Sequence, residues 1–374
     1  MPKSGDCQQD RQIFLKNMQQ VQITKRKFTQ YLLQWNREFN TRLMPWKGEK
    51  DPYKIWLSEI ILQQTRVSQG LQYYEKFIKI FPDIDRLAKA SEEKVYKLWE
   101  GLGYYTRCNN LIKTARFISK EKKGKFPDSF EEILKLKGIG SYTASAIASF
   151  AYNLPNAVVD ANVYRVLARV FGIQKPVDST EGKMFFSALA AELLDENQPA
   201  VYNQALMDFG AVVCKPVAPL CNQCVFKNSC RAYVTDKINK LPVKGKKLNI
   251  KTRWFYYLVT EYNQKLFIRQ RTIKDIWKNL YEFFLLESGE NATIDGILKI
   301  AEKRKLIQKN FYHVDSVSPL LTQQLTHQKI KGQFIKLSLS REPVIPGMIA
   351  VSQKQINRYA FPKFINSYLE KHYR

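Results

Sequence analysis

The pattern of apolar and polar positions changes about two thirds of the way along the chain. Up to about residue 230, apolar side chains recur at helical spacing and are separated by Gly, Pro or Asp, which predicts one helix after another. The clearest of these runs cover residues 53–67, 104–120, 141–152, 162–171 and 202–213. We therefore expect the first part of the chain to be entirely α-helical.

The remainder of the chain has a different pattern. Residues 254–271 form two β-rich runs around a polar Asn263-Gln264 turn, and residues 332–340 alternate as a strand does. Helical patterns return near 293–308 and 352–371. The two parts are joined by a basic stretch, KLPVKGKK, which contains proline and glycine and therefore predicts a linker. The boundaries that follow are a flexible N-terminus (1–25), a helical domain (26–235), a basic linker (236–250) and a smaller α+β domain (251–374).

Composition limits the class of partner. The chain has 374 residues, and its 60 Lys and Arg against 34 Asp and Glu give a formal net charge of +26. So large an excess indicates a polyanionic partner, and we expect a nucleic acid. The N-terminus has no apolar run suited to a signal peptide, and no apolar stretch reaches the roughly 18 residues that a membrane span needs. We therefore expect an intracellular protein without membrane contact.

Four cysteines fall in one short stretch, CKPVAPLCNQCVFKNSC, over residues 214–230. They are Cys214, Cys221, Cys224 and Cys230. A reducing compartment disfavours disulfides, so a joint role as metal ligands is the better interpretation. Spacing alone leaves both zinc and an iron–sulfur cluster open. Cys7 and Cys108 stand apart and are expected to be ordinary thiols.

Three further features suit phosphate binding or acid–base chemistry. The stretch KLKGIGSYTAS places Gly138 and Gly140 between helical runs, where backbone amides at a helix start can hold a phosphate. Asp160 begins the next helix, as a helix cap would, and could also stabilise positive charge. Glu59 lies on a helical face with Ile55, Leu62, Gln63 and Arg66. Apolar neighbours would raise its pKa and make it an acid, although a surface Glu beside Arg66 is the simpler alternative.

The order of motifs resembles a known family. SEIILQQTRV, GLGYYTRCNNL, LKGIGSYTASAI, VVDANVYRVLARVF and Cys-x6-Cys-x2-Cys-x5-Cys are similar to the helix-hairpin-helix DNA glycosylases, and among these to the MutY-type adenine glycosylases. The match runs from about Met44 to Cys230 and continues more weakly beyond it. It implies a multi-domain protein, with an all-α helix-hairpin-helix glycosylase domain carrying a [4Fe–4S] cluster loop and an α+β Nudix-like domain after it. The four cysteines of residues 214–230 are the cluster ligands that it implies.

The resemblance also assigns roles. Glu59 would protonate adenine, Asp160 would stabilise the sugar cation, and Tyr142 and Asn162 would support the intermediate. The adenine pocket would be lined by Trp46, Lys47 and Gln204, with Lys47 in the place of a commoner Arg. Contacts to DNA and to the oxidised guanine would come from Gln64, Thr65, Leu102, Tyr104, Gly138, Gly140, Ser141, Thr326 and His327.

Two alternative functions remain beside this one. Endonuclease III-like glycosylase/lyases carry a Lys where Tyr142 stands, and they lack Glu59. A non-catalytic, redox-sensing iron–sulfur protein that binds DNA is the other. In the second domain, Leu325-Thr326-His327 stands where the family usually has Phe-Ser-His, and no glutamate run typical of Nudix hydrolases is present. We expect a monomeric, monofunctional glycosylase on double-stranded DNA containing adenine opposite 8-oxoguanine or guanine, in the bacterial cytoplasm at the nucleoid.

Overall fold

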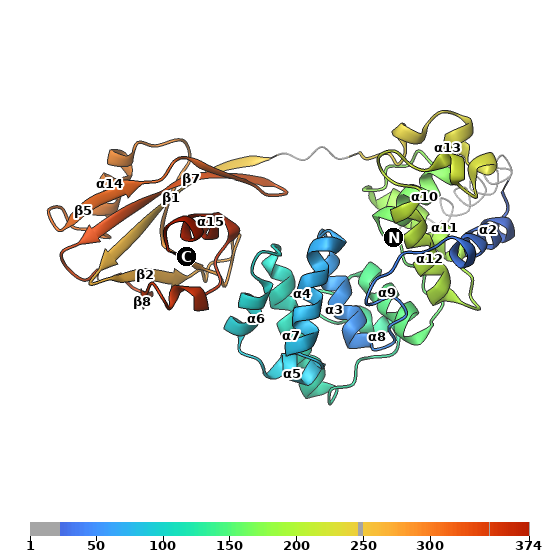
Figure 1. The fold of residues 1–374 in the computed structure, drawn as a ribbon, viewed down its shortest axis with the longest axis horizontal. Coiled ribbons are helices and arrows are strands. Elements are labelled where there is room, and N and C mark those ends of the chain that lie inside the picture. Colours follow the sequence, from blue (N-terminus) through green and yellow to red (C-terminus); the bar gives the residue numbers. More distant parts are fainter. Residues whose placement is uncertain (1–22, 246–249, 344, 374) are drawn as a thin grey trace, which may run out of the picture. The chain divides into compact units, whose positions relative to one another are not determined.

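The computed structural model describes residues 23–245, 250–343 and 345–373. The chain divides into two compact units, one formed by residues 1–64 and 117–247 and the other by residues 65–116 and 248–374. Figure 1 shows the helical part and the sheet-containing part of the chain. The N-terminus that the sequence predicts to be flexible lies almost wholly outside the described residues, as does Cys7.

The first unit consists of helices. They are α2 (Lys25–Glu38), α3 (Pro52–Leu62), the end of α7 (Tyr105–Glu121), α8 (Phe130–Leu134), α9 (Ser141–Tyr152), α10 (Ala161–Phe171), α11 (Thr180–Leu193), α12 (Pro199–Val212) and α13 (Arg231–Val234), with short 3-10 turns η1 (Cys221–Gln223), η2 (Lys227–Ser229) and η3 (Ile238–Lys240). The cysteine loop is fastened to this core by Phe226, which is fully buried. Its ring stacks on Phe28 at 4.7 Å and meets Phe209 edge-on at 5.2 Å. The loop is thus an integral part of the helical core.

The helix predicted over residues 53–67 is shorter in the structure. Helix α3 begins at the Asp51 cap and ends at Leu62, and α4 (Val67–Ile80) begins separately. Gln64, between them, has a φ of 56°, in the left-handed region that a right-handed helix cannot contain. Placing Arg66 on the same helical face as Glu59 was therefore wrong, whereas Gln63 caps α3 and contacts Thr143 of α9, next to the Tyr142 that binds Glu59.

The second unit combines helices with a sheet. The helices are α4, α5 (Ile84–Lys89), α6 (Glu92–Trp99), most of α7, α14 (Ile294–Lys303) and α15 (Lys363–His372). The strands are β1 (Lys251–Tyr262), β2 (Lys265–Gln270), β3 (Tyr281–Glu282), β4 (Phe284–Ser288), β5 (Tyr312–Val317), β6 (Leu321–Gln324), β7 (Gln328–Leu339) and β8 (Met348–Ser352), and a 3-10 turn η4 (Ile356–Arg358) follows. The strand order is β3-β2-β1-β7-β5, with β4 on β1, β6 on β7 and β8 on β2.

A parallel pair of long strands forms the centre of this sheet. Strands β1 and β7 run side by side in register, and Tyr257 stands opposite Phe334. Side chains alternate across the pleat, so the two faces bury different residues. Tyr256 and its neighbours pack with α14 on one face, while Phe334 stacks on Tyr368 of α15 at 4.3 Å on the other. The sheet is therefore covered by one helix on each face, which explains its continuous apolar run.

Two predictions for this part are confirmed and one holds only in part. The hairpin around Asn263-Gln264 joins β1 and β2, and both turn residues have positive φ. The alternating run at 332–340 falls mostly within β7. The helix predicted near 352–371 is confirmed in its second half, as α15, and is wrong for residues 353–362, which contain a turn and the 3-10 turn η4. In the part of the chain that the structure describes, no helix is long and apolar enough to span a bilayer.

Candidate active site and DNA contacts

Glu59 is a buried carboxyl group on α3. It is 7% exposed, and loss of hydration raises its pKa to about 7. The Tyr142 hydroxyl, at the start of α9, donates a hydrogen bond of 2.7 Å to its Oε2. The negative charge of Asp160 raises the same pKa further. Near neutral pH, Glu59 therefore exists partly as a protonated acid.

Asp160 has a more polar setting at the start of α10. Its Oδ1 accepts the backbone N–H of Val163 at 2.8 Å, as a helix cap does, and its Oδ2 accepts the Asn162 side-chain amide at 2.7 Å. Burial raises the pKa of Asp160, and these donors lower it again in part. Because Asp160 is held by several N–H donors and Glu59 by one hydroxyl, the proton favours Glu59. The two carboxyl groups are set for different protonation states.

The predicted hairpin joins α8 to α9. Gly138 has a φ of 80°, a conformation that favours glycine. Gly140 has a φ of −96°, which other residues also adopt, so its backbone conformation does not require glycine. Gly140 and Ser141 are exposed, and no side chain caps the first turn of α9. The amides at this helix start are thus open to an external acceptor.

Lys47 and Gln204, two of the residues predicted for the adenine pocket, meet on a carboxylate that the sequence did not single out. Asp208 has no exposed side-chain surface. It accepts hydrogen bonds from Gln204 at 2.9 Å and Arg42 at 2.8 Å, and pairs with the Lys47 ammonium at 3.0 Å. Trp46, in the turn before α3, is 9% exposed. An acidic residue one helical turn after Gln204, on an otherwise apolar helix, was the signal that could have found this network.

A cavity of about 590 Å³ opens beside Tyr142 and Asp160. Lys183 of α11 and Lys244 also line it. The chain around Lys244 is attached to the helical unit, because Val177 N–H donates to the Val243 carbonyl at 3.0 Å. The cavity thus combines catalytic candidates with cationic side chains.

Arg165 connects the candidate site to the cysteine loop, and sequence reasoning missed it inside an apolar helix pattern. Its guanidinium donates to Asn162 Oδ1 at 2.8 Å and to the carbonyl of Cys214 at 2.7 Å. One turn later, Arg169 donates to the Lys215 carbonyl at 2.7 Å and lies 3.5 Å from Cys214 Sγ. Both arginines of α10 therefore hold the loop against the helix that carries Asp160.

The four loop cysteines line one small cavity, and none forms a disulfide. Burial raises the pKa of Cys224 to about 12 and that of Cys230 to about 11. Among the described residues, no three Cys, His, Asp or Glu side chains are grouped closely enough to hold a single metal ion. Cys108 lies apart from the loop, as predicted, and is a buried free thiol.

The predicted DNA-contact residues fall in two settings. Gln64 and Tyr104 both have positive φ, a strain that in proteins is concentrated at functional sites. Gln64 is exposed and Thr65 is partly buried. Leu102 is 6% exposed, so its side chain belongs to the core.

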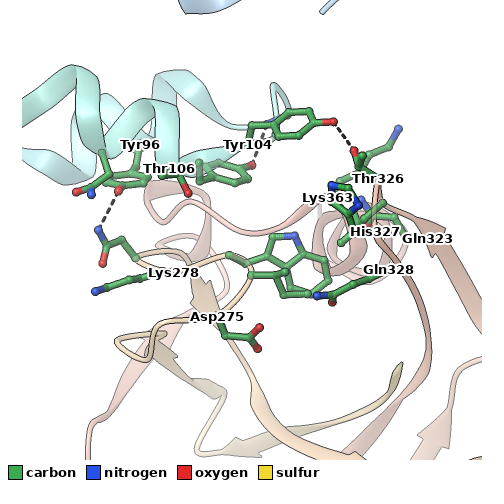
Figure 2. Close-up of a pocket in the computed structure, with 18 of the residues that line it drawn as sticks. Tyr96, Tyr104, Thr106, Asp275, Lys278, Gln323, Thr326, His327, Gln328 and Lys363 are labelled. Atoms are coloured by element: carbon green, nitrogen blue, oxygen red, sulfur yellow. Dashed lines mark hydrogen bonds between the residues drawn. The ribbon is translucent and has the colours of Figure 1, made fainter. Parts of the chain in front are cut away.

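Within the second unit, Tyr104 contacts residues 325–327, which are predicted to read the base opposite adenine and are called the reading loop below. Its hydroxyl and that of Thr326 are 2.5 Å apart, and Figure 2 shows the phenol pointing toward Thr326. A cavity of about 770 Å³ lies beside them and is also lined by His327. Thr326 and His327 are exposed, so both can meet a ligand without rearrangement of the fold.

Known proteins are similar to this chain in sequence and in fold. A model of the HhH-GPD superfamily base excision DNA repair proteins matches residues 57–186, and a NUDIX domain model matches residues 255–371. A solved thermostable thymine-DNA glycosylase is 28% identical, with a TM-score of 0.52 over 56% of this chain and 97% of that one. A DNA-trapped endonuclease III is 18% identical with a TM-score of 0.50, over 57% of this chain and 99% of that one, and shares the fold. These matches define a helix-hairpin-helix base excision DNA repair glycosylase with a Nudix-like second domain.

Curated relatives narrow the class. The adenine DNA glycosylase of Buchnera aphidicola subsp. Baizongia pistaciae is 39% identical over 68% of this chain and 73% of its own length. That of Buchnera aphidicola subsp. Schizaphis graminum is 36% identical over 76% and 83%. The human adenine DNA glycosylase is 40% identical over 57% of this chain and 41% of its own length. The chain belongs to the adenine DNA glycosylase family.

Proposed function

We propose that the protein removes adenine that is mispaired with 8-oxoguanine or guanine in duplex DNA, by hydrolysis of the N-glycosidic bond. The observation that carries this proposal is the pair of differently tuned carboxyl groups, with Glu59 raised to a pKa of about 7 by burial and Asp160 held by N–H donors. An acid and a carboxylate side by side are what cleavage of a glycosidic bond requires.

The target base must leave the helix before these groups can reach it, so the adenine is flipped into the site. Glu59 then gives its proton to a ring nitrogen of adenine, and the bond between the sugar and the base breaks with its electron pair moving to the base. Asp160, as a carboxylate, stabilises the positive charge that develops on the sugar. Asn162 fixes the Asp160 carboxylate through its 2.7 Å hydrogen bond, and Glu59, now ionised, accepts a proton from the attacking water.

The proposed reaction is hydrolysis without strand cleavage. A glycosylase that also cuts the strand uses an amine to form a Schiff base with the sugar. Here the residue at the start of α9 is Tyr142, whose hydroxyl is engaged with Glu59. We therefore expect an abasic product with an intact strand.

The same proposal includes a [4Fe–4S] cluster held by Cys214, Cys221, Cys224 and Cys230. Four thiols around one cavity suit it, while a single zinc ion would need a tighter convergence than the described residues show. When bound, such a cluster would cross-link the loop through its thiolates. Elemental analysis of protein purified without oxygen should find iron; stoichiometric zinc would overturn this part of the proposal.

Double-stranded DNA is the proposed partner, and a single polypeptide is the proposed active form. The net charge of +26 and the open amides of the hairpin support a backbone contact that does not depend on sequence. Such an enzyme works where the chromosome lies, which in a bacterium is the cytoplasmic nucleoid.

The test is single-turnover adenine release from duplexes with adenine opposite 8-oxoguanine, guanine or cytosine. We expect release to be fastest opposite 8-oxoguanine, slower opposite guanine and slowest opposite cytosine, and Glu131→Gln, an exposed carboxyl on α8, serves as a control that should change nothing. Absence of release from all three duplexes would exclude the proposed function.

A further inference from the structure

The Glu100 side chain connects segments of the second unit that are far apart in the sequence, and the adenine chemistry does not use it. It follows α6 directly, and its Oε1 accepts hydrogen bonds from the backbone N–H of Phe361 at 2.8 Å and from the Asn366 side chain at 2.9 Å. Its Oε2 pairs with Lys97 at 2.6 Å, and the same ammonium donates to the Tyr359 carbonyl at 3.0 Å. We call this set of contacts the Glu100 anchor.

The contacts of the Glu100 anchor are of the stronger kind. The Glu100 side chain is 15% exposed, so solvent screens its charge only in part. Hydrogen bonds to an ionised group are shorter and stronger than neutral ones. Removing the carboxylate would take the acceptor away from the backbone N–H of Phe361, while the Asn366 amide would keep its contact of 3.3 Å with the Phe361 carbonyl.

The anchor lies at one end of a rigid turn that leads to Tyr104. Gly101 has a φ of 95°, and a side chain there would meet the Tyr73 hydroxyl at 2.6 Å. Tyr73 in turn donates to the Glu100 carbonyl at 2.7 Å, and the Trp99 indole donates to the Gly103 carbonyl at 3.0 Å. Every step from Glu100 to Tyr104 is therefore constrained, so a shift of Glu100 moves Tyr104 with it.

The other partners of the anchor belong to the segment that leads into α15, the helix that covers one face of the sheet. The sheet carries Thr326 in the loop between β6 and β7. The anchor thus ties the turn that carries Tyr104 to the domain that carries Thr326, and Figure 2 shows the two hydroxyl groups that it brings together.

We infer that Glu100 is a positioning residue for discrimination between 8-oxoguanine and guanine. The Glu100 anchor holds the turn of Tyr104 against the sheet domain so that Tyr104 and Thr326 read the base opposite adenine as one unit. Two groups that must contact one base edge together lose selectivity when either is displaced by about 1 Å. This inference rests on the proposed function, since it names what fixes the geometry of its reading step.

The test compares the ratio of adenine release opposite 8-oxoguanine and opposite guanine in four proteins. In Glu100→Ala the ratio should fall by about tenfold, which corresponds to the loss of about one well-placed hydrogen bond to the lesion, while the rate opposite guanine stays as in wild type. Glu100→Gln keeps an acceptor oxygen for Phe361 but places an NH2 donor opposite the Lys97 ammonium, so it loses both the charge and the acceptor there and should lie between. Glu92→Ala, at the first residue of α6, removes a carboxylate that pairs with Arg116 in an exposed contact, and it should keep the wild-type ratio.

A second measurement is independent of catalysis. Amide hydrogen exchange at Phe361, whose N–H the anchor holds, should be faster in Glu100→Ala than in wild type and in Glu92→Ala. Unchanged exchange, or an unchanged ratio in a folded Glu100→Ala protein, overturns the inference. An equal loss of rate opposite both bases also overturns it, because that result means general disruption. Failure of the wild-type protein to release adenine would instead contradict the proposed function. The exchange measurement would still test the contact between Glu100 and the Phe361 N–H.

Discussion

The proposed catalytic centre around Glu59 and the proposed reading loop, Leu325-Thr326-His327, have opposite requirements for burial. Glu59 is buried, raised in pKa and held by Tyr142 before any substrate arrives. Thr326 and His327 are exposed on a loop between two strands. An acid must be desolvated in advance to be protonated near neutral pH, whereas groups that read a base in DNA must stay open until the DNA arrives. The pKa of Glu59 is therefore set by the helical core, whereas selectivity for the opposing base depends on how the exposed side chains are positioned.

The largest effect on adenine release is expected when the acid is removed and the shape of its side chain is kept. Glu59→Gln loses the proton, so single-turnover adenine release should fall by at least ~100-fold while binding to the mispaired duplex survives. Asp160→Asn should have a similar effect, and asparagine still caps α10, so the fold is kept. Near-normal release by Glu59→Gln would remove Glu59 from the mechanism.

Burial of Glu59 should also cost stability in a pH-dependent way. A carboxyl whose folded pKa is raised from 4.5 to about 7 contributes stability below pH 4.5 and loses it as the pH rises toward 7. The free energy of unfolding of wild type should fall by roughly 3 kcal/mol relative to Glu59→Gln over that window, since one pKa unit corresponds to about 1.4 kcal/mol. Chemical denaturation at several pH values measures the difference, and Glu131→Gln should show none; a gap that does not change with pH would mean that Glu59 is not desolvated.

Much of the helical part could be predicted because local chemistry dictates it. The Asp160 cap is confirmed, and the apolar runs at 141–152 and 162–171 became α9 and α10. The helix predicted over 53–67 is too long, because the apolar spacing continues past Gln64. Periodicity does not reveal that this residue has a left-handed backbone conformation, which ends the helix. For the same reason, periodicity did not show that residues 353–362 precede the helix α15 and do not belong to it.

The polar contacts that organise both regions could not be found in this way. Asp208 and Arg165 are buried polar residues within apolar helix patterns, and their partners come from distant segments. The Glu100 anchor joins residues that are far apart in sequence. Spacing along one helix says which face is buried, but it does not say which charged group arrives from elsewhere to satisfy a buried one.

Substitutions in the reading loop should have the smallest effect on the rate of adenine release and a clear effect on selectivity for the opposing base. Thr326→Ala combined with His327→Ala should lower the preference for 8-oxoguanine over guanine by about 10-fold, because one or two hydrogen bonds to the lesion are lost. The ratio of release rates for the two opposing bases, at one salt concentration, measures it. Thr322→Ala, an exposed threonine on β6, is the matched control. An unchanged ratio in the double variant would mean that the lesion is read elsewhere.

The central claim, that a buried Glu59 acts as the acid, is tested most directly by the pH dependence of single-turnover release by the wild-type protein. The pKa of about 7 predicts a rate that declines above that pH, approaching tenfold per pH unit as the protonated fraction falls. At the acid end, protonation of Asp160, whose pKa is also raised by burial, should lower the rate again. A midpoint near pH 7 on the alkaline side is the result that we predict. A rate that stays constant up to about pH 9, where a carboxyl with this pKa would be almost fully ionised, would contradict the account.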